Sequence, residues 1–250
     1  MVQATTQFNI LISNIPISNL DKMNQQDLNT QPPYLYAPYK STILRSPTKP
    51  LLIVKENLKN INLPVFGESA IGKYDNDLTK NARKNGEPIG ERIKVSGKVM
   101  DEYGRPLRAV LIEIWQANSA GRYIHKEEIH DAPLDPNFLG AGRMLTDDEG
   151  RYTFYTIKPG AYPWGNHYNA WRPNHIHFSV IGHQMGHRLI TQMYFPGDPL
   201  FEFDPIFQSV PVHARELLIA KFNMEWTEPE FALAYEFNIV LRGKYQTPFE

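Results

Sequence analysis

The sequence predicts a mainly β protein: an antiparallel β-sandwich with long loops, an extended N-terminal arm and one or two short helices. Residues 93–99 alternate apolar and polar side chains, which is the pattern of a half-buried strand. Further short runs rich in β-branched and aromatic residues are bounded by Gly, Pro, Asn or Asp. Many short strands with little helix are typical of a sandwich or barrel.

The first part of the chain is expected to be an arm rather than a helical domain. Residues 1–90 are rich in Asn, Gln, Pro and Lys and show no sustained 3.6-residue period. Such a segment needs a surface to lie on, either its own domain or a partner chain. We expect residues 91–250 to form the sandwich as one domain, because a chain of 250 residues can bury one substantial core.

The expected strands follow one another at short intervals after residue 91. They cover residues 93–99, 110–116, 151–157, 175–181, 188–195 and 235–242. The one convincing helix is VHARELLIAKF, at 212–222. An insertion of roughly residues 117–143 separates the second strand from the third. A loop of this length in a compact β domain is more often functional than idle.

Composition and charge exclude several classes of function. With 26 basic and 27 acidic residues the net charge is −1, so no basic field attracts nucleic acid or anionic lipid. The absence of Cys excludes disulfides, thiolate metal sites and a Cys nucleophile, and suits a reducing cytoplasm. The segment FNILISNIPI lacks signal-peptide features, and no apolar run reaches membrane-spanning length. We expect a cytoplasmic protein without nucleic-acid or membrane partners.

Two segments favour a non-catalytic hypothesis. GKVMDEYGRPLRAVLIEIW and TDDEGRYTFYTIKPGAY each carry an Asp-x-x-Gly turn, in which Gly takes the positive φ that other residues resist. Both segments resemble prealbumin-like modules, which occur as carbohydrate-binding, adhesin-stalk and peptidase-associated domains. One hypothesis is therefore a binding or structural module whose aromatic side chains form the core.

A pair of histidines suggests a metal site instead. His175 and His177 lie two residues apart in an expected strand, so their side chains share one face while Ile176 and Phe178 point to the other. The pair alone does not separate a metal site from packed or solvent-facing histidines. A cupin-like ferrous site would need a carboxylate soon afterwards, and FSVIGHQMG contains none.

Tyrosines lie around this pair in the sequence. Tyrosine is a good ligand only as phenolate, which at neutral pH requires a strong Lewis acid because its unperturbed pKa is ~10. Ferric iron is such an acid. Two phenolates and one hydroxide would neutralise a trivalent ion, so the site could be buried without uncompensated charge.

The motifs GRYIHK, PGAYPW and WRPNHIHF resemble those of the intradiol ring-cleaving dioxygenases. APLDPNF, TDDEGRY, ITQMYFPGDPL and VLRG extend the resemblance over residues 35–245. The chain is most similar to the branch that cleaves protocatechuate (3,4-dihydroxybenzoate), and within it to the iron-bearing β type. The resemblance implies one non-haem Fe(III) per chain, held by Tyr123, Tyr162, His175 and His177.

The resemblance also implies further site residues. Tyr162 would leave the iron and accept a substrate proton. Arg172 would stabilise the negative charge that develops on the ring, and Gln192 would line the substrate and oxygen pocket. The residues implied around the substrate ring are Tyr39, Trp115, Trp164 and Ile206. Gly165 stands where some relatives carry Arg, so any contact of that Arg would be absent or replaced.

The implied reaction belongs to aromatic catabolism by the β-ketoadipate pathway. It cleaves protocatechuate with O2 to 3-carboxy-cis,cis-muconate. The implied partner is a homologous, iron-free α chain in a higher αβ oligomer. Catechol and hydroxyquinol dioxygenases are the alternatives within the family, but they carry a helical N-terminal dimerisation region, whereas residues 1–90 are aperiodic and rich in Pro.

Overall fold

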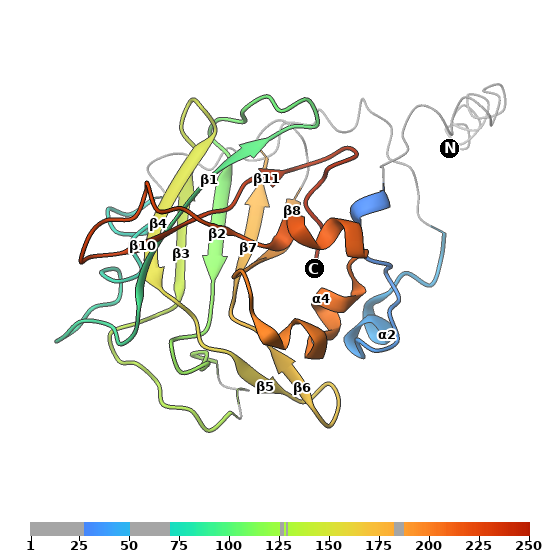
Figure 1. Ribbon diagram of the computed structural model, residues 1–250, viewed down its shortest axis with the longest axis horizontal. Coiled ribbons are helices and arrows are strands. Elements are labelled where there is room, and N and C mark those ends of the chain that lie inside the picture. The colour runs from blue at the N-terminus through green and yellow to red at the C-terminus, as the bar shows by residue number, and fades with distance from the viewer. Residues whose placement is uncertain (1–27, 51–70, 126–127, 129, 183–187) are drawn as a thin grey trace, which may run out of the picture.

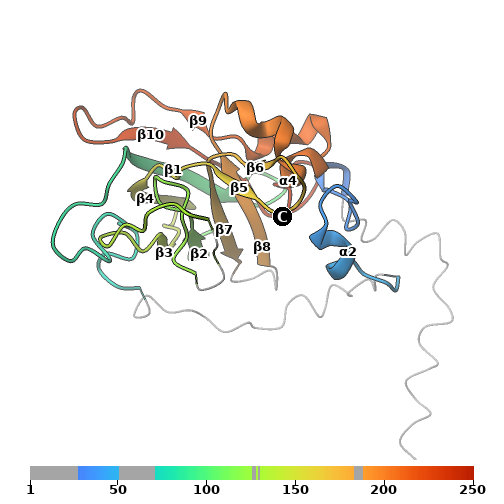
Figure 2. The ribbon, with the colours of Figure 1, turned by 90° about the horizontal axis from the view of Figure 1, so that it is seen from below.

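The computed structural model describes residues 28–50, 71–125, 128, 130–182 and 188–250. Two β-sheets pack face to face in these residues (Figures 1 and 2). One sheet contains β1 (Arg92–Met100), β4 (Arg151–Ile157), β9 (Lys221–Phe222), β10 (Leu233–Glu236) and β11 (Ile239–Val240). The other has the order β3 (Ala141–Leu145), β2 (Leu111–Trp115), β7 (His175–Ile181) and β8 (Arg188–Tyr194). The predicted mainly β sandwich is confirmed.

The core lies between the two sheets, where the alternating residues of β1 meet those of β2 and β7. Ile93, Val95 and Val99 are fully buried and belong to one cluster of side chains. From the opposite sheet, Ile176 and Phe178 enter the same cluster. The alternation of β7 therefore turns Ile176 and Phe178 inward, as predicted, and leaves His175 and His177 on the other face.

Strand β1 carries the main difference from the predicted topology. It pairs antiparallel with β4, but β10 and β11 both run parallel to it. The expectation of a purely antiparallel sandwich is therefore wrong at this strand. The single strand expected at 235–242 is divided after the bond from the amide of Phe237 to the carbonyl of Ser96, at 2.9 Å. The amide of Lys98 then bonds to the side chain of Asn238, also at 2.9 Å, and not to backbone.

Other elements also differ from the expected ranges. β3 occupies the end of the expected insertion, where Ala141 and Gly142 gave no strand pattern, and it forms by pairing with β2. β5 (Tyr162–Trp164) and β6 (Ala170–Arg172) form a separate hairpin that the sequence did not indicate. His167 and Tyr168 lie in its turn.

The helix expected at 212–222 is shorter and tighter than predicted. It is a 3-10 helix, η4 (Val212–Leu218), and the chain then enters β9. The amide of Ala220 bonds to the carbonyl of Tyr194 at 2.9 Å, so pairing with the end of β8 replaces the next helical turn. The remaining helices in the described ranges are η1 (Leu28–Thr30), α2 (Ser41–Arg45), η3 (Pro199–Phe203) and α4 (Pro205–Ser209).

Residues 28–45 lie beside the helical segments at one end of the sandwich (Figures 1 and 2). Residues 1–27 and 51–70 of the predicted arm lie outside the described residues, so the division into 1–90 and 91–250 stays a prediction. Within the described ranges, no helix is long and apolar enough to cross a membrane.

Candidate metal centre

The four predicted ligands come from three places in the chain and meet beside β7. β7 supplies His175 and His177, β5 supplies Tyr162, and the loop after β2 supplies Tyr123. The ring centroids of the two histidines are 4.9 Å apart, those of the two tyrosines 5.6 Å, and those of Tyr162 and His175 5.7 Å. The hydroxyl of Tyr123 lies 3.5 Å from Nε2 of His175. The fold thus assembles the side chains that sequence motifs had only grouped.

The two tyrosine-bearing segments are tied to each other. Asn118 accepts hydrogen bonds on its side-chain oxygen from the amides of Ala120 and Arg122, at 2.9 and 3.0 Å. The carbonyl of Asn118 accepts from the amide of Gly160 at 2.8 Å, just before Tyr162. Gly121 between them has φ +77° and its Cα packs on the carbonyl of Ala161, which leaves no room for a Cβ. Tyr123 and Tyr162 are therefore held at a fixed spacing by backbone contacts.

Each histidine is oriented through its Nδ1 atom. Nδ1 of His175 lies 2.6 Å from the carbonyl oxygen of Pro173, and Nδ1 of His177 lies 3.0 Å from a carboxylate oxygen of Glu250. Both partners accept, so Nδ1 carries the proton in each ring and Nε2 keeps its lone pair for a metal. Burial, together with the nearby positive charge of Arg172, holds the pKa of His175 well below its usual value, so the ring is neutral.

The donor set fits a trivalent cation. Burial raises the pKa of the Tyr123 phenol well above its usual value. Burial also raises the pKa of the Tyr162 phenol, although the charge of Arg172 opposes this shift. Both phenols therefore keep their protons until a strong Lewis acid displaces them. Two phenolates, two neutral imidazoles and a hydroxide would leave a ferric site electrically neutral. In the described ranges, no group of three or more His, Cys, Asp or Glu is arranged to hold a metal ion.

Glu250 adds a partly buried negative charge beside the histidine pair. Burial alone would raise the pKa of its carboxyl, but His177 and Arg172 lower the pKa to about 2. Glu250 was not predicted as a site residue, because nothing in the C-terminal stretch of the sequence signals contact with β7.

Arg172 lies in a buried polar network behind the ligands. Its Nε is 3.2 Å from a carboxylate oxygen of Asp204, and both side chains are almost fully buried. The guanidinium also donates to the side-chain oxygen of Gln192. Tyr194 lies between them, with its hydroxyl 2.9 Å from Gln192 and 3.0 Å from Asp204. Asp204 and Tyr194 were not predicted. The pair Asp204-Pro205 signals a helix start, but not an ion pair with Arg172.

The residues predicted around the substrate ring fall into two groups. Tyr39 and Trp164 contact each other edge to face at 5.5 Å, and Arg172 lies over the Trp164 ring, also at 5.5 Å. Ile206 joins this group through Asp204, which accepts a hydrogen bond from its amide at 3.0 Å. Trp115 belongs elsewhere: its ring is stacked on that of His177, with centroids 4.8 Å apart.

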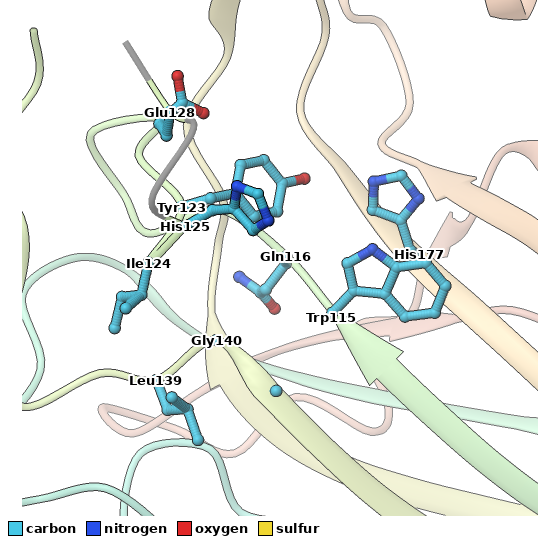
Figure 3. A pocket seen from close by; sticks show the side chains of 10 residues that line it. Trp115, Gln116, Tyr123, Ile124, His125, Glu128, Leu139, Gly140 and His177 are labelled. Atoms are coloured by element: carbon cyan, nitrogen blue, oxygen red, sulfur yellow. The ribbon is translucent and has the colours of Figure 1, made fainter. Parts of the chain in front are cut away.

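An open cavity of about 500 Å³ reaches the ligands from the side of Trp115 (Figure 3). Its lining includes Tyr123 and His177 together with Gln116, His125, Glu128 and Leu139. In Figure 3 the Tyr123 hydroxyl points toward the His177 ring, and the Trp115 indole lies against that ring. Two of the candidate ligands, Tyr123 and His177, are therefore accessible from outside through this cavity.

Comparison with known proteins places this geometry in a family. The family model described as Dioxygenase matches residues 61–243, and one described as Protocatechuate 3,4-dioxygenase beta subunit N terminal matches residues 24–57. The chain belongs to the intradiol dioxygenase family. The family resemblance predicted from the sequence motifs is thus confirmed.

Individual relatives of this dioxygenase differ in how much they share with it. The protocatechuate 3,4-dioxygenase beta chain of Burkholderia cepacia is 60% identical over 225 residues, which cover 90% of this chain and 96% of the relative. The alpha chain of the Pseudomonas putida enzyme is 29% identical over 70% of this chain and 83% of its own length. The solved structure of 3-chlorocatechol 1,2-dioxygenase from Rhodococcus opacus has the same fold, with a TM-score of 0.53 at 24% identity over 72% of this chain and 70% of that one.

Proposed function

We propose that this dioxygenase is the iron-bearing β chain of a protocatechuate 3,4-dioxygenase, which cleaves 3,4-dihydroxybenzoate with O2 to 3-carboxy-cis,cis-muconate. The observation that carries the proposal is the convergence of two phenols and two oriented imidazoles at one buried centre. The choice of substrate is supported by the Burkholderia cepacia beta chain at 60% identity. The Candida albicans catechol 1,2-dioxygenase, at 37% identity, matches only 48% of this chain.

Tyr123, Tyr162, His175 and His177 would hold the metal. Ferric iron at this position would bind the two catechol oxygens and withdraw electron density from the ring. By the family resemblance, Tyr162 would be the ligand that exchanges with substrate, and its phenolate oxygen would accept a catechol proton as general base. Tyr123 and the two histidines would stay in place.

Arg172 and Gln192 would act on the substrate from the buried polar network that they form with Asp204 and Tyr194. Although burial opposes it, the carboxylate of Asp204 keeps the pKa of Arg172 well above its usual value, so the guanidinium stays charged. A fixed cation in a buried site stabilises negative charge that develops on the substrate ring without having to reorient. The side-chain amide of Gln192 faces the same site: its oxygen accepts from Arg172, and its hydrogen bond to the carboxyl of Glu250 helps to lower the pKa of that carboxyl.

The proposed partner is a homologous α chain. Its support is the relative named as an alpha chain, which aligns with 70% of this chain. Large apolar side chains are also exposed on and near the β9–β10 hairpin, namely Phe222, Met224, Trp226, Phe231 and Leu233. Exposed apolar side chains gathered on one hairpin are typical of an interaction surface. The higher αβ oligomer stays a prediction.

Oxygen uptake tests the proposed reaction. We expect the chain, coexpressed with its homologous α chain, to consume O2 with 3,4-dihydroxybenzoate faster than with catechol and to release 3-carboxy-cis,cis-muconate, a tricarboxylate. His175→Ala in the same complex is the control and should abolish both uptake and bound iron. Faster uptake with catechol would assign the chain to the catechol-cleaving type, and no uptake by an iron-loaded complex would contradict the dioxygenase proposal.

A further inference from the structure

Glu250 reaches the candidate metal centre from the last residues of the sequence. We propose that it is a positioning residue: its side-chain carboxylate accepts the Nδ1 proton of His177 and so turns Nε2 toward the metal. This inference rests on the proposed function, because it takes His177 as a metal ligand. The contact is close and sheltered, with 3.0 Å between the two atoms and side-chain exposures of 10% for His177 and 16% for Glu250.

Two contacts together define the position of the His177 ring. Trp115 is stacked on it with an interplanar angle of 3°, which fixes the plane of the imidazole. Stacking alone still allows the imidazole to flip by half a turn about its Cβ–Cγ bond, which exchanges Nδ1 with Cδ2 and keeps the ring in the same plane. A carboxylate on one edge removes this freedom, because only one orientation places Nδ1–H on Glu250 and Nε2 on the side of Tyr123 and His175.

The two histidines depend on different parts of the chain for this orientation. His175 uses the carbonyl of Pro173, two residues earlier, so its orientation is fixed within the loop that leads into β7. His177 uses a residue that is distant in sequence. The geometry of this ligand is therefore coupled to the packing of the C-terminal segment, whereas that of His175 is not.

The C-terminal segment is anchored firmly enough to serve this purpose. The amide of Glu250 donates to the carbonyl of Ile190 on β8 at 2.9 Å. The carbonyl of Pro248 accepts from Thr191 at 2.6 Å, and the amide of Phe249 donates to the side-chain oxygen of Gln31 at 2.8 Å. In Figure 1 the C-terminus lies close to β8. The carboxylate is thus held at a fixed distance from β7.

A carboxylate does more than a neutral acceptor in this position. It stabilises the Nδ1–H tautomer and raises the basicity of Nε2, and loss of such a partner typically costs about 10–100-fold in metal affinity or activity. The amide of Glu250→Gln can still accept the same hydrogen bond but carries no charge. Glu250→Ala removes both the charge and the acceptor, so the two variants separate the contributions.

Iron retention in the αβ complex provides the test. We expect Glu250→Ala to release ferric iron to a chelator about 10–100-fold faster than the wild type, and Glu250→Gln to fall between them. The tyrosinate-to-iron absorption band should shift in both variants, which a purely structural role would not cause. Glu236→Gln is the matched control, because its carboxylate accepts from Asn238 at the surface and should change neither measurement.

Each outcome decides the role of Glu250. Iron release at the wild-type rate with an unshifted band in Glu250→Ala overturns the proposal. If Glu250→Ala does not fold, the same comparison on Glu250→Gln decides, and wild-type behaviour there overturns the role of the charge. A wild-type complex that takes up no ferric iron would refute the proposed function itself. If the wild type binds iron and the Glu250 variants match it in iron release and in absorption, only the proposed role of Glu250 is refuted.

Discussion

At the scale of single residues, the guanidinium of Arg172 depends on a partner that lies on another element. Asp204 is completely buried, and it serves both as the ion-pair partner of Arg172 and as the N-cap of α4, where its side chain accepts from the amide of Ile206. Removal of one member of a buried pair leaves the other charge uncompensated, which is far more costly than removal of both. Substitution of Arg172 alone therefore mixes catalytic and structural effects.

We predict that Arg172→Ala lowers the free energy of unfolding by about 3–5 kcal/mol and that Asp204→Asn in the same chain restores part of the loss. A double-mutant cycle measured by denaturant unfolding should give a clear coupling energy. The exposed pair Arg108 and Asp148, 3.6 Å apart, is the matched control and should show little coupling because exposed pairs contribute little. Additive effects at Arg172 and Asp204 would contradict the prediction.

At the scale of elements, β1 owes its unusual pairing to one glycine. Gly97 lies on the inward face of the strand, and the carbonyl of Phe237 occupies the place where a Cβ would be. The same carbonyl accepts a hydrogen bond from the hydroxyl of Tyr152 at 2.6 Å. The segment that joins β10 to β11 can therefore lie this close to β1 only where the side chain is missing.

Gly97→Ala should destabilise the sandwich, because the new methyl group collides with backbone and not with a side chain that can move. We expect a loss of about 1–3 kcal/mol, or more, in the free energy of unfolding, measured as a lower melting temperature. Gly165→Ala is the control: its Cβ would meet no atom within 4 Å, so we expect a change within about 0.5 kcal/mol. Equal melting temperatures for the two variants would refute this account of β1.

At the scale of the whole molecule, the two ends of the described chain hold each other. Thr30 donates to the carbonyl of Gln246 at 2.8 Å across a separation of 216 residues. Gln31 is buried and bonds to both Thr247 and Phe249, and Tyr34 is stacked on Phe249 with centroids 5.4 Å apart. The N-terminal segment thus supports the tail that carries Glu250 to His177.

Gln31→Ala should loosen this tail without touching the metal centre. We expect faster amide hydrogen exchange in residues 244–250, because the amide of Phe249 loses its acceptor, together with faster iron release than in the wild type. Gln208→Ala is the control, since its amide bonds to the carbonyl of Phe201 instead. Unchanged exchange in the tail of Gln31→Ala would show that the anchor lies elsewhere.

The sequence by itself determined the local features. Alternation predicted β1, β4 and β7 closely and placed His175 and His177 on one face, because side-chain direction in a strand depends only on neighbouring residues. Motifs named the family and the four converging side chains. These are properties that short stretches of sequence carry on their own.

Only the tertiary structure decided the features that depend on hydrogen bonds or ion pairs between residues far apart in the sequence. The parallel neighbours of β1, the strand β3 and the truncation of the helix at Leu218 all follow from hydrogen bonds to other elements. Asp204 and Glu250 have no motif, since each acquires its role through a residue far away in the chain. A buried charge must have a partner, but the sequence does not say which one, and the fold supplies it.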